Sequence, residues 1–421
     1  MIGSGIAGLA AAWALKRDHE VTLFERHPQL GMDAFSVEVT GASGTQRVDV
    51  PMRVVYEGYY PELTRVYREA GVALETLDYS GTFSAHEGRT YFGYRNVRVG
   101  RHALPLPRGW HAPHWKTAPI VRDSLRFFGS VAAELRDGAV AGKTLGEYLR
   151  WRGYSQAFSD DFLVPVLASI CTCTYEAVRN YPAATVLDYY AAGLFSTPVL
   201  RARDGIADVV AKLSAGVHDV RLGAAVERIA THGDGVLVRA GGLDAPFDHV
   251  VIATQANHAL SMLAARDDER EALACFSYQP SLVVTHTDER LAPADRRSWG
   301  PVNIIVAPGA EMPMATIWMN TLHPQLGETH VFQTWNPIVE PRPARVISQA
   351  AVERPVVDAA SLRGLELLER LHAQPGRRVW FCGAYAAPGV PLLESATRSA
   401  LAAAASIEAH AQARRRAVTG T

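Results

Sequence analysis

The stretch that decides the fold is MIGSGIAGLAAAWALKRDHEVTLFER, residues 1–26. Gly3, Gly5 and Gly8 have the G-x-G-x-x-G spacing of a dinucleotide-binding turn. The alanine-rich run 8–17 predicts a helix after the turn, and the apolar, β-branched run 21–24 predicts a buried parallel strand. A turn, a helix and a strand in this order predict the opening of a Rossmann-like domain.

Each glycine of the turn has a physical reason to be there. Gly3 permits a tight turn, Gly5 lets the backbone approach a pyrophosphate, and Gly8 lets the helix pack closely on the sheet. The phosphate charge is then expected at the helix N-terminus. The residues of this turn that we expect to contact the cofactor are Gly3, Ser4, Gly5, Ile6, Ala7 and Gly8.

The end of the next strand carries a second feature of such sites. Glu25 follows Gly8 by 17 residues and is expected to accept hydrogen bonds from the ribose hydroxyls. A carboxylate at this position repels a 2′-phosphate and therefore disfavours NADP, although the cationic Arg26 lies directly beside it. The predicted ligand is a dinucleotide without that phosphate.

The bulk composition excludes several other classes of function. The chain has 421 residues with 42 Lys and Arg against 43 Asp and Glu, so no global field favours nucleic acid or a membrane surface. No apolar run approaches the ~18 residues of a transmembrane helix. The four cysteines lack metal-site spacing and do not suggest a disulfide framework, which predicts no metal site and a cytoplasmic location.

The pattern along the chain predicts an α/β fold with two interleaved domains. Residues 1–80, 201–275 and 365–421 are expected to form a discontinuous Rossmann-like dinucleotide-binding domain. Residues 81–200 and 276–364 are expected to form a mixed substrate domain. Its part from about 117 to 200 is predicted to be a helical lid, and 276–364 to be an antiparallel sheet.

The C-terminal stretch VWFCGAYAAPGVPLLESATRSALAAAASIEA, residues 379–409, bears on which dinucleotide is bound. A predicted strand ends at Gly383, a loop follows, and a helix begins near Glu394, Ser395 and Ala396. A second helix N-terminus would therefore point into the site, beside small residues that permit close approach. This stretch resembles the flavin-binding segment of the flavin-containing amine oxidase superfamily, which includes monoamine oxidases and phytoene desaturases.

The resemblance extends along most of the chain and implies the cofactor FAD. It includes the opening turn and the stretches 48–72, 221–238 and 247–254. It implies that the backbone of Val226 touches the adenine. Closest is a bacterial branch known only as predicted NAD/FAD-binding oxidoreductases, to which the stretches HTDERL (286–291), IWMNTL (317–322), TWNP (334–337) and FCGAY (381–385) are similar.

Some positions depart from the pattern of that superfamily. Gly31 and Met32 stand where many relatives have a Gly-Gly pair beside the flavin, and Asp33 stands in place of the following Arg. Leu392 replaces the aromatic residue that guides amines in monoamine oxidases, which argues against simple amine oxidation. No second G-x-G-x-x-G is present, so electrons are expected to pass to dioxygen or another acceptor.

The number of residues before Gly3 raises a separate expectation. Only Met1 and Ile2 precede it, whereas the family has several apolar strand residues there. We therefore expect an upstream start or a truncated chain. Restoring the missing residues should then raise flavin occupancy and thermal stability.

Candidates for a catalytic base are few and have structural alternatives. His286 lies in a predicted strand and can equally be a hydrogen-bonded core residue, and Tyr385 follows Gly383 near the expected flavin. A base is required only where an O–H or activated C–H proton leaves.

The sequence thus predicts an FAD-dependent oxidoreductase of the amine-oxidase type. Its small-molecule substrate is expected to be largely apolar and to lose a hydride to flavin in a C–C or C–N dehydrogenation. Three alternatives remain open: an FAD-dependent double-bond isomerase, a non-catalytic FAD-binding scaffold, and a classical NAD dehydrogenase.

Overall fold

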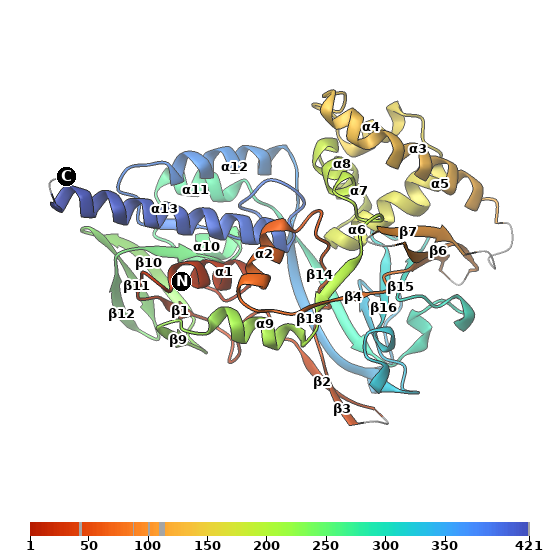
Figure 1. Cartoon of the computed structure of the whole chain (residues 1–421), viewed down its shortest axis with the longest axis horizontal. Helices are drawn as coiled ribbons and strands as arrows, with labels where there is room; N and C mark the ends of the chain where they lie inside the picture. Colours follow the sequence, from red (N-terminus) through yellow and green to blue (C-terminus); the bar gives the residue numbers. More distant parts are fainter. Residues whose placement is uncertain (42–43, 87, 100–101, 109–113, 420–421) are drawn as a thin grey trace.

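The computed structural model describes residues 1–41, 44–86, 88–99, 102–108 and 114–419. Two parts are visible in Figure 1. One contains the N-terminus, α1 and α13, and the other contains the helices α3 to α8 above a large sheet. The long strands β14 and β18 run between them.

A parallel sheet organises the first part. Strand β1 (Thr22–Phe24) pairs in parallel with β9 (Asp219–Arg221), and β13 (Val250–Ile252) pairs in parallel with β19 (Val379–Phe381). Ile2 forms parallel bridges to both Phe24 and Ile252 and so joins the two pairs into one layer. Apart from Val220 at the edge strand β9, which is 38% exposed, the apolar side chains of this layer are buried, as is usual for a parallel sheet covered by helices.

Small residues let helices lie closely against each other on one side of this sheet. Helix α1 (Ile6–Leu15) contacts α13 (Leu393–Thr419) and α9 (Gly205–Ser214). Its residues Ala10, Ala11 and Ala12 are completely buried in this contact region. Helix α2 (Pro61–Glu69) also contacts α13. The helix predicted over 8–17 is thus confirmed, although it begins and ends two residues before the predicted bounds.

A second core cluster joins further elements to the parallel sheet. An antiparallel three-stranded sheet is ordered β10–β11–β12, with its turn at residues 233–234 as the sequence predicts. The elements that pack here are β10 (Val226–His232), β11 (Gly235–Ala240), β12 (Leu243–Phe247), α10 (Ala256–Met262), α11 (Asp267–Ala274) and α12 (Ala359–His372).

The second part is built on an eight-stranded sheet in the order β18–β14–β17–β16–β15–β5–β6–β7. Every neighbouring pair is antiparallel except β15 and β5, so the predicted antiparallel sheet is confirmed with one exception. Its strands are β5 (Gly81–Ala85), β6 (Thr90–Val99), β7 (His102–Pro107), β14 (Tyr278–His286), β15 (Val302–Val306), β16 (Met314–Trp318), β17 (Phe332–Trp335) and β18 (Val346–Pro355).

Residues 117–191 are almost entirely helical, which confirms the prediction for this stretch. They form α3 (Thr117–Arg136), α4 (Leu145–Trp151), α5 (Gln156–Phe158), a π-helical turn (Ser159–Leu163), α6 (Val164–Cys171), α7 (Tyr175–Asn180) and α8 (Ala183–Ala191). The pairs β2 (Val37–Gly41) with β3 (Gly44–Val48) and β4 (Leu74–Leu77) with β8 (Val199–Ala202) were not expected. Short 3-10 turns occupy Glu289–Leu291, Arg296–Ser298, Met319–Thr321, Pro324–Leu326 and Pro343–Arg345.

No helix among the described residues combines the length and apolarity needed to cross a bilayer.

Candidate functional site

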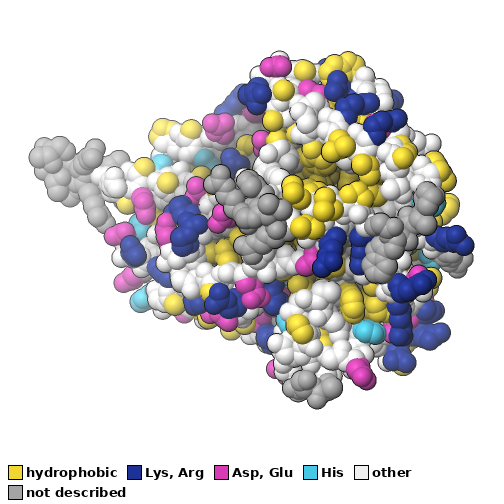
Figure 2. Space-filling model, turned by 45° about the vertical axis from the view of Figure 1, so that its right-hand side comes forward, with side chains coloured by type: hydrophobic (Ala, Val, Ile, Leu, Met, Phe, Trp, Pro, Cys, Tyr) yellow, Lys and Arg dark blue, Asp and Glu magenta, His cyan; other side chains and the backbone are white. Residues whose placement is uncertain are grey.

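A cavity of about 820 Å³ connects the two parts of the molecule. Its wall includes Gly5 and Ile6 of the glycine turn, Leu392 and Leu393 at the start of α13, and side chains of the large sheet such as Trp335. Figure 2 shows one face of the molecule with a hollow that has hydrophobic side chains in and around it. The glycine turn therefore opens into the same space as the apolar face of the sheet.

The glycine turn has the geometry that the sequence predicts. Gly3 has a φ of +91°, which favours glycine. A Cβ at Gly8 would lie 1.9 Å from the carbonyl oxygen of Gly3, so only glycine permits this approach of helix and turn. A Cβ at Gly5 would meet no atom within 4 Å, which leaves room for a ligand.

The N-terminus of α1 is available to an anion. Gly5 is its N-cap residue and has no side chain to accept a hydrogen bond from the first turn. The first intrahelical bond runs from the Leu9 N–H to the Gly5 carbonyl, so the preceding amides Ile6, Ala7 and Gly8 have no partner within the helix. These amides and the helix dipole are the donors that a pyrophosphate requires.

Glu25 is buried at the end of β1 and is held by hydrogen bonds. Its Oε2 accepts bonds from the N–H and the hydroxyl of Ser4 at 3.0 and 2.5 Å, and its Oε1 accepts one from the N–H of His27 at 2.9 Å. The Ser4 hydroxyl in turn accepts a bond from the N–H of Gly31 at 2.6 Å. The structure thus brings Ser4, Glu25 and Gly31 into one cluster, and Arg26 and His27 line the cavity beside it.

Two neighbours of this cluster complete its surroundings. Met32 is buried and lines the cavity. Val226 begins β10 two residues after Ala224, whose N–H donates to the Glu25 carbonyl at 2.8 Å. Val226 therefore lies on the Glu25 side of the turn, where the resemblance locates an adenine.

The cofactor-binding residues predicted at the C-terminal end are not themselves among the residues that line the cavity, but their neighbours are. Helix α13 begins at Leu393, one residue before the predicted start, and Leu392 and Leu393 form the wall. The Glu394 carboxylate accepts hydrogen bonds from the N–H groups of Glu62 and Leu63 at 3.1 and 3.0 Å and so caps α2. Burial raises the pKa of this carboxyl.

Gly383, Ser395 and Ala396 support the loop before α13. The N–H and carbonyl of Gly383 both bind the Ser399 hydroxyl at 3.0 Å, and its φ is +151°. The Ser395 hydroxyl donates to the Val390 carbonyl at 2.9 Å, and Ala396 is buried.

The two candidate bases lie outside the cavity wall. Tyr385 is buried against Phe276, with ring centroids 4.8 Å apart, and it lines a separate small cavity. The His286 Nε2 is 2.7 Å from the hydroxyl oxygen of Thr334, and its Nδ1 accepts a bond from the Asp288 N–H at 3.1 Å. Burial lowers the pKa of His286 to about 4. Both positions suit packing better than contact with a substrate.

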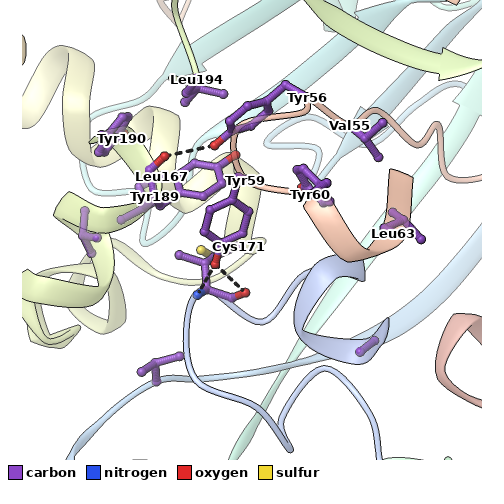
Figure 3. Packing of buried hydrophobic residues seen from close by; sticks show 14 of the residues in the cluster. Val55, Tyr56, Tyr59, Tyr60, Leu63, Leu167, Cys171, Tyr189, Tyr190 and Leu194 are labelled. Carbon is purple, nitrogen blue, oxygen red and sulfur yellow. Dashed lines mark hydrogen bonds between the residues drawn. The ribbon is translucent and has the colours of Figure 1, made fainter. Parts of the chain in front are cut away.

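Tyrosines missed by the sequence analysis form part of the wall (Figure 3). The Tyr56 hydroxyl donates to the carbonyl of Tyr189 at 3.0 Å. Behind them, the Tyr59 hydroxyl donates to the Val390 carbonyl at 3.3 Å and accepts from the Val390 N–H at 2.7 Å. Figure 3 shows these rings gathered between α2, α8 and the loop before α13. The stretches YEGYY (56–60) and DYY (188–190) were the available signal, but nothing in the sequence brings them together.

The charges in the wall are mainly positive. Arg26, Arg53 and Arg354 line it, against the single carboxylate of Glu353 among the described lining residues. Arg53 donates to the Pro51 carbonyl at 3.2 Å and is attracted by Asp49. Burial lowers the pKa of both Arg53 and Arg354.

Comparisons with known proteins agree with this geometry. Residues 1–70 match the family model of the NAD(P)-binding Rossmann-like domain. A fatty acid isomerase from P. acnes that produces CLA matches over 95% of this chain and 96% of its own, with a TM-score of 0.65 and 16% identity. Putrescine oxidase, bound to putrescine, matches over 97% and 98% with a TM-score of 0.63 and 12% identity.

Cyclohexylamine oxidase from Brevibacterium oxydans also matches over 97% of this chain and 98% of its own, with a TM-score of 0.62 and 15% identity. The chain has the amine-oxidase-type fold. The resemblance noted from the sequence is thus confirmed at the level of the fold. No curated protein sequence matches the chain. Within the amine-oxidase-type fold, the relatives named here include both oxidases and an isomerase.

Proposed function

We propose that the protein is an FAD-dependent oxidoreductase that removes a hydride from a largely apolar small molecule. The observation that carries this proposal is the shared cavity. It contains a dinucleotide turn with free helix amides at one side and aromatic and aliphatic side chains at the other. A redox cofactor and its substrate can therefore meet inside one cavity.

The residues present fit FAD. Gly5 leaves open space for a pyrophosphate, α1 offers its first amides, and the Ser4–Glu25–Gly31 cluster lies where a ribose would bind. The start of α13 at Leu392 and Leu393 offers a second helix N-terminus to the flavin ring. When bound, the flavin supplies a hydride acceptor at its N5 atom.

The side chains of the cavity then have two tasks. Aliphatic and aromatic residues such as Ile170, Phe195 and Trp335 exclude water and orient an apolar substrate. The Tyr56 hydroxyl stays protonated, because burial raises its pKa, and it remains bound to the Tyr189 carbonyl. C–C or C–N dehydrogenation is the reaction we propose, with dioxygen or another acceptor reoxidising the cofactor.

The first test is the visible absorption spectrum of the purified protein. Flavin bands are expected. They would distinguish FAD from a nicotinamide dinucleotide, which does not absorb visible light. A colourless protein that stays colourless after FAD is added and excess is removed would overturn the proposal. A protein that keeps its flavin but neither is bleached by nor converts any compound of a broad substrate panel would instead be a scaffold.

A flavin-dependent double-bond isomerase is the second candidate. The likeness to a fatty acid isomerase over 95% of the chain favours it. Anaerobic incubation with a substrate separates the two reactions. A dehydrogenase bleaches its flavin and stops after one turnover, whereas an isomerase keeps converting substrate without an acceptor.

A further inference from the structure

Arg354 is a cation in the cavity wall without an acidic partner. It lies near the end of β18 and is paired with Gln279 of β14. The neighbouring Glu353 also lines the cavity, but its carboxylate accepts a bond from Asn257 at 3.1 Å and forms no ion pair with Arg354. The Arg354 guanidinium instead lies 5.8 Å from the ring centroid of Trp335.

The groups that act electrostatically on Arg354 include no anion that the structure pairs with it. They include the thiols of Cys171 and Cys173, the phenols of Tyr60 and Tyr181, and the like-charged guanidinium of Arg53. Among the described residues, no carboxylate forms an ion pair with it. A guanidinium in such surroundings is costly unless an anion accompanies it.

A buried arginine elsewhere in the protein has a carboxylate partner. Arg377 and Glu269 have side chains only 2% and 5% exposed and lie 2.9 Å apart. Arg53, which lines the same cavity, has Asp49 as a neighbouring anion. Arg354 differs from Arg377 in having no such carboxylate partner.

A second polar group at the same place also lacks a partner. Thr172 lies between Cys171 and Cys173 at the end of α6 and lines the cavity. Thr172 is 2% exposed, and its hydroxyl has no hydrogen-bond partner among the described residues. Thr172 also has a φ of +50°, a conformation that a β-branched residue rarely adopts.

The rest of the wall is apolar where Arg354 enters it. Ile170 at the end of α6, Ile317 of β16 and Trp335 of β17 belong to this lining. The cavity thus combines the unpaired guanidinium of Arg354 with a long hydrophobic surface, while Arg26 and Arg53 also line it and form no ion pair with any described residue. An amphipathic anion matches this combination.

We propose that Arg354 binds the carboxylate of an apolar monocarboxylic acid, which is the substrate class of the site. This inference rests on the proposed function. The planar guanidinium can donate two parallel hydrogen bonds to a carboxylate, and the Thr172 hydroxyl is a further donor nearby. The hydrocarbon part occupies the apolar lining, in the same cavity that would hold the flavin. A protonated amine is repelled by Arg354, which separates this protein from the amine oxidases that share its fold.

The test compares decanoate with decanol, an uncharged molecule of the same chain length, by isothermal titration calorimetry of the holoprotein. Decanoate is expected to bind the wild type at least tenfold more tightly than decanol. Arg354→Gln should weaken decanoate about 10- to 100-fold and leave decanol unchanged, because only the charge-assisted bonds are lost. Arg354→Lys should retain part of the affinity, and Thr172→Val should weaken decanoate less than Arg354→Gln.

The matched control is Arg297→Gln, since Arg297 is 82% exposed and paired with Asp295. It should bind both molecules like the wild type. Equal affinity of decanoate and decanol in the wild type, or equal loss of both in Arg354→Gln, would overturn the proposal. Flavin content is measured by absorbance on every variant, and calorimetry requires neither colour nor turnover. A wild type that stays without flavin after FAD is added, yet still prefers decanoate, would therefore refute the proposed function and support the carboxylate site.

Discussion

The two ends of the cavity are built in different ways. At the dinucleotide end, the backbone is the binding surface, and a short stretch of sequence provides most of it: Gly3, Gly5 and Gly8 shape one turn and one helix N-terminus. At the substrate end, side chains from α6, β17 and β18 form the wall. The comparison teaches that a site built from backbone groups tolerates almost no substitution of its glycines. In a site built from side chains, a single substitution can change which ligand is bound.

The largest expected effect is on stability and comes from the glycine turn. Two variants there distinguish a glycine needed for packing from a glycine needed for binding. Gly8→Ala places a methyl group 1.9 Å from the Gly3 carbonyl oxygen, so we expect a loss of about 3 kcal/mol in the free energy of unfolding. Gly5→Ala is its matched control, because its methyl group meets no protein atom within 4 Å. This variant should keep its melting temperature and lose flavin occupancy. A Gly8→Ala protein with wild-type stability would contradict the packing explanation.

The next effect is on the pH dependence of stability and concerns His286, a buried residue of the large sheet. His286 has a folded-state pKa of about 4 against about 6.5 unfolded, so the unfolded state binds its proton first as the pH falls. Stability is therefore lost between pH 6.5 and 4, and about 2 kcal/mol of this loss should be present at pH 5.

Urea unfolding of the wild type and His286→Asn at pH 7 and pH 5 measures this contribution. The variant should show a difference between the two pH values that is smaller by about 2 kcal/mol. Burial also lowers the pKa of His249, His323 and His372 to about 4, so both proteins retain a residual dependence. An unchanged dependence in the variant would show that His286 does not titrate as the structure implies.

The smallest effect concerns the connection between α13 and α2. Glu394→Ala removes the acceptor of the Glu62 and Leu63 amides and should lower the free energy of unfolding by about 1 kcal/mol. Glu69→Ala at the exposed end of α2 loses only its surface ion pair with Arg65 and should change stability by less than about 0.5 kcal/mol. Thermal unfolding of both variants provides the comparison, and equal melting temperatures would argue against the capping role.

What the sequence could predict follows the same division. The glycine turn, the helix after it and the start of α13 were predictable because each depends on neighbouring residues. Arg354 was not, since its place in the wall depends on the pairing of β18 with β14, whose residues are far apart in the chain. Tyr56 and Tyr189 were missed for the same reason, while Tyr385 and His286 attracted attention by residue type and lie outside the wall.

The order of the parallel sheet has a consequence for synthesis on the ribosome. Ile2 and β1 come from the start of the chain, yet β19 and the helix α13 that contacts α1 come from residues 379–419. During translation, α1 can meet α9 once residues 205–214 have emerged, but its buried alanine face lacks α13 until this last stretch has emerged. The dinucleotide end therefore contains the first residues to be synthesised and is among the last regions to complete its fold. Until the final helix leaves the ribosome, the nascent chain depends on protection from aggregation.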